Sequence, residues 1–246
     1  MPELANDLAL SKKIQSVKAS GIRIFDNKVS TIPGIIKLTL GEPDMNTPEH
    51  VKTAAIESIR NNDSHYAPQK GKLELRQAIS NYLKKATGVV YDPETEIVVT
   101  VGATEAINAT LFSITNPGDK VAIPTPVFSL YWPVATLADA DYVLMNTSED
   151  NFKLTPERLE STLKEESNIK AVILNYPVNP TGVEYTESEI RALAEVIKAH
   201  NLYVITDEIY STLTYGVKHF SIASVIPERA IYISGLSKSH AMTGYR

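Results

Sequence analysis

The chain has 246 residues, of which 43% are hydrophobic and 22% charged, and this composition excludes a disordered or collagen-like protein. The net charge of -5 argues against a nucleic-acid-binding protein, and the lack of cysteine excludes disulfides, zinc–thiolate sites and cysteine nucleophiles. No apolar run approaches the roughly 20 residues that cross a bilayer. The N-terminal sequence has no apolar signal core, so we expect a cytoplasmic protein that binds neither nucleic acid nor membrane, and we predict no metal site.

Residues 1–45 are predicted to form a helix, an arm and the turn LGEPDMNTP outside the main domain, which spans residues 46–246. Helix starts are clearly indicated from there on. Thr47-Pro48-Glu49 and Thr155-Pro156-Glu157 each place a capping hydroxyl before a proline at the first helical position. Thr186, followed by Glu189, is typical of a capping box.

Short apolar runs rich in β-branched residues alternate with the helical patterns. They cover residues 97–101, 121–123, 142–145, 171–174, 202–205 and 231–233. Their nearly continuous hydrophobicity suits strands that are buried on both faces. The alternation predicts an α/β fold, with a mostly parallel sheet sandwiched by helices. Ligands bind at the carboxyl ends of the strands in such sheets, so the residues that follow the strands are the candidate site.

Three of the predicted strands run into residues that suit a polar ligand. Gly102, Ala103 and Thr104 form a small turn before a helical pattern, and the free N–H groups of a helix start attract phosphate; the plainer alternative is a turn capped by Thr104. Asn179, in the stiff loop NPTG, offers an amide donor or belongs to an ordinary turn. Asp207 places a carboxylate after an apolar strand, where it needs a cationic partner unless it caps the next helix.

The last predicted strand is followed by the sequence SGLSKSH, which places Lys238 at the same edge. A desolvated amine serves as a nucleophile or base, whereas the plainer alternative is a solvated surface lysine. Arg246 offers a planar fork for phosphate or forms a surface salt bridge, and Phe128 offers a ring face or fills the core. With the phenol of Tyr210, these groups suit a phosphorylated pyridine aldehyde held at its phosphate, ring and aldehyde carbon.

The chain resembles the class I/II aminotransferases of the pyridoxal-phosphate-dependent fold type I, in the branch of the prokaryotic aspartate and aromatic aminotransferases. The resemblance covers the whole chain and rests on the motifs LGEPDMNTPEHV, HYAPQKGKLELRQAI, VGATEA, NYPVNPTG, DEIY and SGLSKSHAMTGYR. The combination of NPTG, DEIY and SK with an arginine eight residues after the lysine is highly specific.

The resemblance implies a role for each matching residue. Lys238 forms the Schiff base with pyridoxal phosphate and shuttles the proton, Asp207 pairs with the pyridinium nitrogen, and Tyr210 and Asn179 bond the ring hydroxyl oxygen. The other cofactor positions that it implies are Gly102, Ala103, Thr104, Ser237 and Arg246 at the phosphate, Phe128 against the ring, and Tyr66 from a neighbouring subunit. The substrate positions that it implies are Gly41, Asn179 and Tyr131. Because Tyr66 serves the neighbouring site, a homodimer is expected.

The chain also departs from the family's pattern. Gly235 stands where many members carry a phosphate-binding serine. The family's C-terminal small domain, its arginine for the substrate carboxylate and the antiparallel strand after GxR are missing, so we expect a piece of a larger enzyme or a chain that cannot transaminate.

The resemblance implies transfer of an amino group from an L-amino acid, with aromatic donors among the candidates, to a 2-oxo acid such as 2-oxoglutarate. An N-acetyl-diaminopimelate aminotransferase and a carbon–sulfur β-lyase are the alternatives on the same fold. Such lyases often carry histidine at the position of Tyr210, so DEIY favours transamination. The cofactor-binding module of a transcription regulator needs a basic domain that residues 1–45 do not provide, and a Rossmann nucleotide binder needs a G-x-G-x-x-G motif that the chain lacks.

Overall fold

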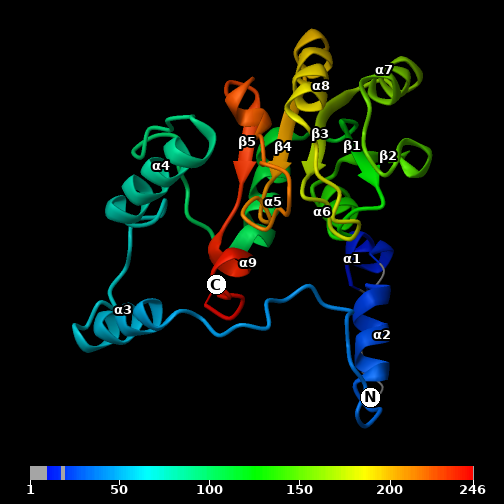
Figure 1. The fold of residues 1–246 in the computed structure, drawn as a ribbon. Coiled ribbons are helices and arrows are strands. Elements are labelled where there is room, and N and C mark those ends of the chain that lie inside the picture. The colour runs from blue at the N-terminus through cyan, green and yellow to red at the C-terminus, as the bar shows by residue number, and fades with distance from the viewer. Residues whose placement is uncertain (1–9, 18–19, 246) are drawn as a thin grey trace.

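The computed structural model describes residues 10–17 and 20–245 (Figure 1). The α-helices are α1 (Lys12–Ser16), α2 (Gly21–Val29), α3 (Glu49–Arg60), α4 (Leu73–Thr87), α5 (Gly102–Ile114), α6 (Tyr131–Leu137), α7 (Pro156–Glu165), α8 (Glu187–Ala199) and α9 (Leu236–Ser239). The strands are β1 (Lys120–Thr125), β2 (Asp141–Asn146), β3 (Ile169–Asn175), β4 (Tyr203–Asp207) and β5 (Ala230–Ile233). Two short 3₁₀ helices are η1 (Ser148–Asp150) and η2 (Ile222–Ser224). None of the described helices is long and apolar enough to cross a membrane.

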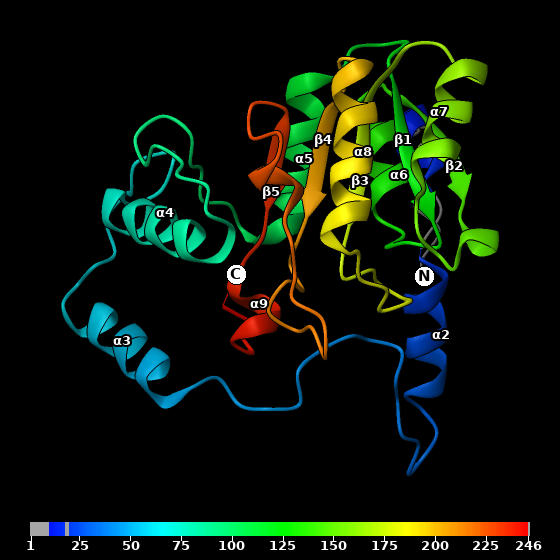
Figure 2. The same ribbon diagram turned by 45° about the horizontal axis from the view of Figure 1, so that its top comes forward.

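The five strands form one sheet in the order β2-β1-β3-β4-β5, and every neighbouring pair is parallel. Helices α5 and α6 cover one face, and α7 and α8 cover the other (Figure 2). Successive side chains of a strand point to opposite faces, so Ala171 and Ile173 of β3 pack with α5 and α6, whereas Val172 and Leu174 pack with α7 and α8. The predicted α/β fold with a parallel sheet between helices is therefore confirmed.

The strand predicted at residues 97–101 is wrong. The segment is a loop between α4 and α5, and Val98 and Val101 are each 60% exposed. The N–H of Val99 donates to the carbonyl of Lys70 at 3.0 Å, which is a loop contact. A strand requires a ladder with a neighbouring strand. Within residues 10–17 and 20–245, no strand pairs with this segment, so its apolar pattern alone was misleading.

Two of the three predicted caps are confirmed. The Thr155 hydroxyl accepts from the N–H of Arg158 at 3.2 Å, and Thr186 and Glu189 form both hydrogen bonds of a capping box. The prediction for Thr47 is wrong, because its hydroxyl donates to the carbonyl of Ala241 at 2.6 Å and α3 begins after Pro48 without a side-chain cap. The hydroxyl thus joins two distant parts of the chain.

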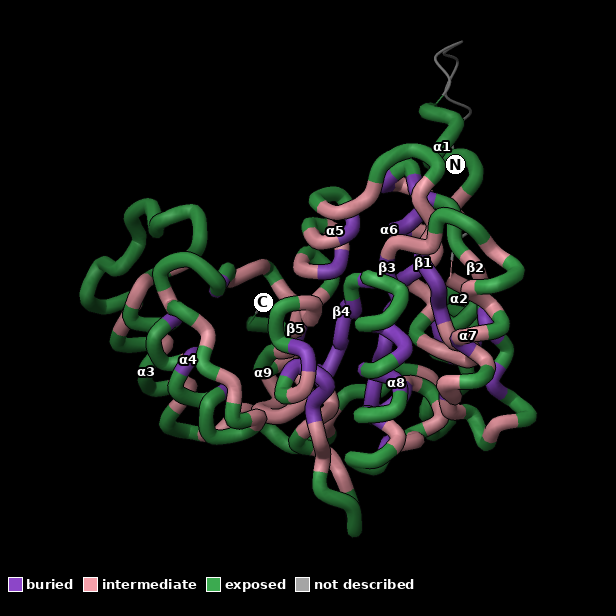
Figure 3. The backbone as a smooth tube through the Cα atoms, turned by 90° about the horizontal axis from the view of Figure 1, so that it is seen from above, coloured by how far each residue is buried: buried purple, intermediate pink, exposed green. Residues whose placement is uncertain are grey.

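Buried residues concentrate in the sheet and in the helix faces that cover it (Figure 3). Helix α3 has no buried residue and, like α4, lies to the side of the sheet (Figures 1 and 3). The chain between α2 and α3 passes the carboxyl ends of the strands next to α9 (Figures 1 and 2). This passage brings residues of the N-terminal segment to the edge where ligands bind in parallel sheets. The predicted domain division at residue 45 stays a prediction.

Candidate active site

Asp207 is a buried carboxylate at the carboxyl end of β4. Its Oδ2 accepts from the Tyr131 hydroxyl at 2.7 Å, and its Oδ1 accepts from the N–H of Ile209 at 3.3 Å. Burial raises the pKa of Asp207 to about 6; the two donors lower it, and the charge of Glu208 raises it further. No lysine, arginine or histidine among the described residues forms an ion pair with Asp207 in the structure. A buried carboxylate with hydrogen bonds but no cation suits a cationic ligand atom.

Tyr131, at the start of α6, is fully buried beneath this carboxylate. Burial, then the charge of Asp207, raises its pKa, so the phenol keeps its proton and acts as a donor. Its ring meets that of Phe128 edge to face, with centroids 5.8 Å apart. The structure thus gives Tyr131 a contact with Asp207 that the sequence did not predict, and its substrate role stays a prediction.

Lys238 lies on α9, directly after β5, and is partly buried. Its Nζ donates to the carbonyl of Gly41 and lies 5.9 Å from the centroid of the Tyr210 ring. A side chain added at Gly41 would begin 3.7 Å from the Tyr210 hydroxyl. Since Asp207 pairs with Ile233 in the sheet register, the acid and the amine leave neighbouring strands at the same edge. The structure therefore brings together four residues that the sequence predicted separately, namely Gly41, Asp207, Tyr210 and Lys238.

Asn179 and Tyr210 also interact at this edge. Burial raises the pKa of Tyr210, the charge of Asp207 raises it further, and a hydrogen bond with the Asn179 side chain lowers it. The N–H of Asn179 donates to Oδ1 of Asn175 at 2.9 Å, and Nδ2 of Asn175 donates to the carbonyl of Asp207 at 3.0 Å. Asn175 thus joins the NPTG loop to the end of β4. Asn175 was not among the predicted site residues, although an asparagine at the end of an apolar run was a signal in the sequence.

The predicted phosphate cradle is the start of α5. Gly102 has a φ of 78°, and the helix has no side-chain cap, so Thr104 is not the cap that the plainer alternative required. Ala103 and Thr104 lie in the first turn, and the start of α5 lies beside α9 with Ser237 (Figures 1 and 2). Backbone N–H groups at such a start attract an anion.

Three other predictions concern residues outside this group. Arg246 lies outside the described residues. Tyr66 is fully exposed in the connection between α3 and α4, and its role in a neighbouring subunit stays a prediction. Phe128 is 38% exposed, as a ring available to a ligand would be.

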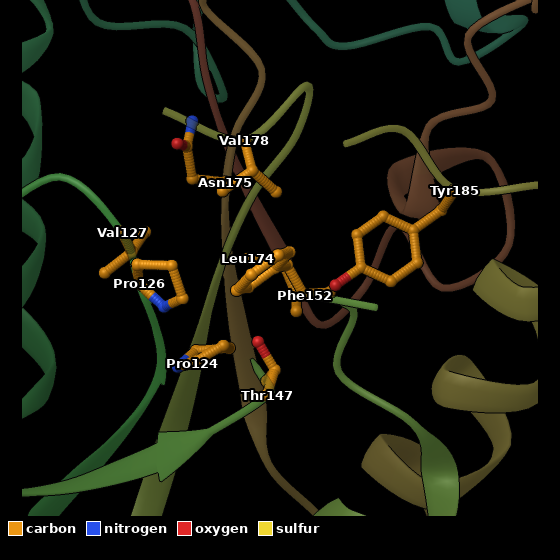
Figure 4. A pocket seen from close by; sticks show the side chains of 9 residues that line it. All are labelled: Pro124, Pro126, Val127, Thr147, Phe152, Leu174, Asn175, Val178 and Tyr185. Carbon is orange, nitrogen blue, oxygen red and sulfur yellow. The ribbon is translucent and has the colours of Figure 1, made fainter. Parts of the chain in front are cut away.

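A small cavity of about 10 Å³ lies near the ends of β1 and β3, lined by residues that include Pro124, Thr147, Asn175 and Tyr185 (Figure 4). This volume suffices for about one water molecule. Neither Asp207 nor Lys238 lines it. The candidate site is accordingly the open strand edge and not this cavity.

The comparisons with known proteins agree with this geometry. A family model described as aminotransferase class I and II matches residues 33–246. The chain belongs to the class I and II aminotransferases. The family that the motifs predicted is therefore confirmed.

Individual relatives and structures carry aminotransferase names. A probable N-acetyl-LL-diaminopimelate aminotransferase of Bacillus subtilis is 45% identical over 96% of this chain and 60% of its own length. The aromatic aminotransferase of Pyrococcus horikoshii matches with a TM-score of 0.87 and 38% identity, over 97% of this chain and 60% of that one. The aspartate aminotransferase of Thermus thermophilus with maleate matches with a TM-score of 0.92 and 35% identity, over 97% and 63%. The chain thus spans about 60% of the length of the curated relatives that it matches.

Proposed function

We propose that this chain is a pyridoxal-phosphate-dependent aminotransferase, which moves an amino group from an L-amino acid to a 2-oxo acid. Membership of the aminotransferase family supports the reaction class. One observation carries the assignment for this chain: Asp207 is a buried carboxylate without a cationic partner among the described residues, on the strand next to the one that leads to Lys238. A buried carboxylate with a purely structural role would be stabilised by a lysine, arginine or histidine of the chain itself, so the lack of such a partner in the described part of the chain suits a cationic ligand.

The described residues fit the cofactor in charge and in hydrogen bonding. Asp207 suits a protonated ring nitrogen, Tyr210 and Asn179 suit the ring oxygen, and the N-terminus of α5 suits the phosphate. Pyridoxal phosphate, when bound, supplies an aldehyde that condenses with amines and a ring that withdraws electrons from the adjacent carbon.

The chain's own residues then supply attachment, orientation and proton transfer. With the cofactor bound, Nζ of Lys238 would be the group that holds it covalently, and as a free amine it would be the general base that takes the proton from the substrate α-carbon and delivers it to the cofactor carbon. The carbonyl of Gly41 holds that amine at the strand edge. Asp207 would keep the ring nitrogen of the bound cofactor protonated, and Phe128 and the start of α5 would orient the ring.

The substrate class is narrowed by the relatives and not by the described site. An N-acetyl-diaminopimelate aminotransferase is the leading alternative, since the Bacillus subtilis relative of that name is 45% identical. The Pyrococcus horikoshii structure, which is 38% identical and is named an aromatic aminotransferase, supports aromatic donors as candidates. The acceptor 2-oxoglutarate, the cytoplasmic location and the homodimer with Tyr66 stay predictions.

The test compares Lys238→Ala with Lys170→Ala, a matched control at the opposite end of the sheet, where Lys170 contacts Asp119. We expect the unaltered chain and the control to bind pyridoxal phosphate with visible absorbance and, after borohydride trapping, to carry it on the peptide that contains Lys238. Lys238→Ala should lose both signals while remaining folded. Retention of the absorbance by Lys238→Ala, or trapping on another lysine, would contradict the assignment. A panel of aromatic, aspartate and diaminopimelate donors then separates the substrate classes, and pyruvate release from cystathionine would indicate a β-lyase.

A further inference from the structure

A second carboxylate, Glu208, follows Asp207 directly and is fully buried on the opposite side of the strand end. Its Oε1 accepts from the hydroxyls of Thr206 and Ser221 at 2.7 Å each, and from Tyr176 at 3.2 Å. Its Oε2 lies 2.6 Å from Nε2 of His219. The mechanism proposed above makes no use of this network, although it adjoins the acid of the site.

His219 lies between two carboxylates. Its Nε2 faces Glu208, and its Nδ1 lies 3.2 Å from Oε1 of Glu184. The side chains of His219, Glu184 and Glu208 are 0 to 11% exposed. Burial lowers the pKa of His219, but the hydrogen bonds with Glu184 and Glu208 and their charges outweigh burial and raise it to about 9. The imidazole is therefore a cation at neutral pH and forms a buried ion pair with Glu208.

Two consecutive buried carboxylates oppose each other's ionisation. The charge of Glu208 raises the pKa of Asp207, which burial has already raised. Because charges interact strongly where solvent is scarce, a cation 2.6 Å from Glu208 weakens the field that Glu208 exerts on Asp207. Without such a cation, the strand end would hold two unbalanced negative charges.

We propose that Glu208 and His219 are positioning residues for the reaction, because the imidazolium of His219 offsets the charge of Glu208 and so keeps Asp207 ionised at the site. The use of this ionised acid by a cofactor rests on the proposed function. The charge coupling itself does not, since it exists in the chain alone.

The other titratable groups that face Asp207 and Glu208 are tyrosine phenols, and the nearby Lys238 is not altered in any variant of the test. Tyr131 and Tyr210 face Asp207, while Tyr91, Tyr176 and Tyr232 face Glu208; all five have raised pKa values and are neutral at pH 7. Lys238 contacts Gly41 and Tyr210 at the same edge and is kept in every variant. The charges that the test changes are therefore those of residues 208 and 219.

The test measures the titration of the Asp207 carboxyl by carbon-13 NMR in the full 246-residue chain, with and without pyridoxal phosphate, and Asp207→Asn assigns the signal. In the chain without cofactor, we expect a midpoint near the pKa of about 6. His219→Gln should raise this midpoint and Glu208→Gln should lower it, each by on the order of one pH unit. In His219→Gln, Glu208 retains three hydroxyl donors, so Asp207, with one hydroxyl and one N–H, is the group that takes up the proton.

Two further variants separate charge from geometry. His219→Lys keeps a cation beside Glu208 and should leave the midpoint near that of the unaltered chain. His200→Gln changes a histidine whose Nε2 lies 3.1 Å from Oε2 of Glu160, just before the amino end of β4, and should leave the midpoint unchanged. These two variants, together with Glu208→Gln, keep the proposal testable if His219→Gln does not fold.

Shifts of opposite sign in Glu208→Gln and His219→Gln, with rescue by His219→Lys, would support the proposal. The proposal is overturned by an unchanged Asp207 midpoint while Glu208 takes up the proton, by shifts of the same sign, or by a lysine variant that behaves like the glutamine variant. If the titrations behave as expected but Lys238 binds no cofactor, the proposed function fails and this inference stands. The reverse result refutes the inference alone.

Discussion

Asp207→Asn is expected to stabilise the chain without cofactor at neutral pH, because the ionised carboxylate is costly where it lies. The pKa of Asp207 is raised from 3.8 to about 6, chiefly by burial, and its charge has no cationic partner among the described residues. A difference of one pKa unit between the folded and unfolded states corresponds to about 1.4 kcal/mol. The ionised group therefore lowers the free energy of unfolding by about 3 kcal/mol, and a neutral asparagine avoids most of this cost.

The sign of the pH dependence follows from the raised pKa. The folded state holds the proton of Asp207 more tightly than the unfolded state, so the unaltered chain loses stability as the pH rises from about 4 through about 6. Asn keeps an acceptor for the Tyr131 hydroxyl but places an amide group near the N–H of Ile209, which reduces the gain.

Urea denaturation of both chains at about pH 4.5 and about pH 8 measures the effect. The stability advantage of the variant should be small at the lower pH and reach about 2–3 kcal/mol at the higher pH. Asp119→Asn is a control that should destabilise the chain as the pH rises, because a hydrogen bond from the N–H of Asn116 lowers the pKa of Asp119 and favours its ionised form. If the difference in the free energy of unfolding between Asp207→Asn and the unaltered chain does not grow with pH, the ionised Asp207 does not destabilise the fold and the reasoning is refuted.

Three further predictions follow from individual contacts. Tyr131→Phe removes a hydrogen-bond donor from Asp207 and should raise the pKa of that carboxyl by on the order of one unit in an NMR titration. An unchanged titration midpoint would mean that water replaces the hydroxyl. Asn175→Ala removes the hydrogen bonds of this side chain with the Asp207 carbonyl and the Asn179 N–H, and should lower the free energy of unfolding by about 1–3 kcal/mol and weaken cofactor binding measured by fluorescence. Unaltered binding would show that the position of the NPTG loop does not depend on Asn175. Thr186→Ala removes a confirmed cap and should cost about 1 kcal/mol in urea denaturation without change in cofactor binding, and a loss of binding would contradict a purely local role.

The sheet could be predicted because all five strands carry nearly continuous apolar runs, although β2 at the edge of the sheet is largely exposed. The same signal failed at residues 97–101, since an apolar pattern does not specify a hydrogen-bonded neighbour. Thr47 failed for a related reason: its hydroxyl has a partner 194 residues away, Ala241, and no local pattern indicates it.

The site was predicted through the rule that ligands bind at the carboxyl ends of parallel strands. That rule found Asp207 and Lys238, because Asp207 ends β4 and Lys238 lies in the short helix that comes soon after β5. It could not find the bond from Tyr131 to Asp207 or the pair of Glu208 and His219, since these depend on how separate elements pack. The consecutive letters Asp and Glu in DEIY do not reveal that the two acids lie on opposite faces with different partners.

The contact between Lys238 and Gly41 affects the order in which the site can assemble. Hydrogen bonds tie residues 41–47 to residues 238–243, in the pairs Lys238 with Gly41, Thr47 with Ala241 and Thr243 with Glu42. The two segments are separated by almost the whole sheet domain, so a ribosome must complete the strands before they can meet. Contacts between such distant segments close late in folding. In a newly made chain, all five strands are therefore synthesised before the contact that holds the reactive amine at the edge of the sheet can form.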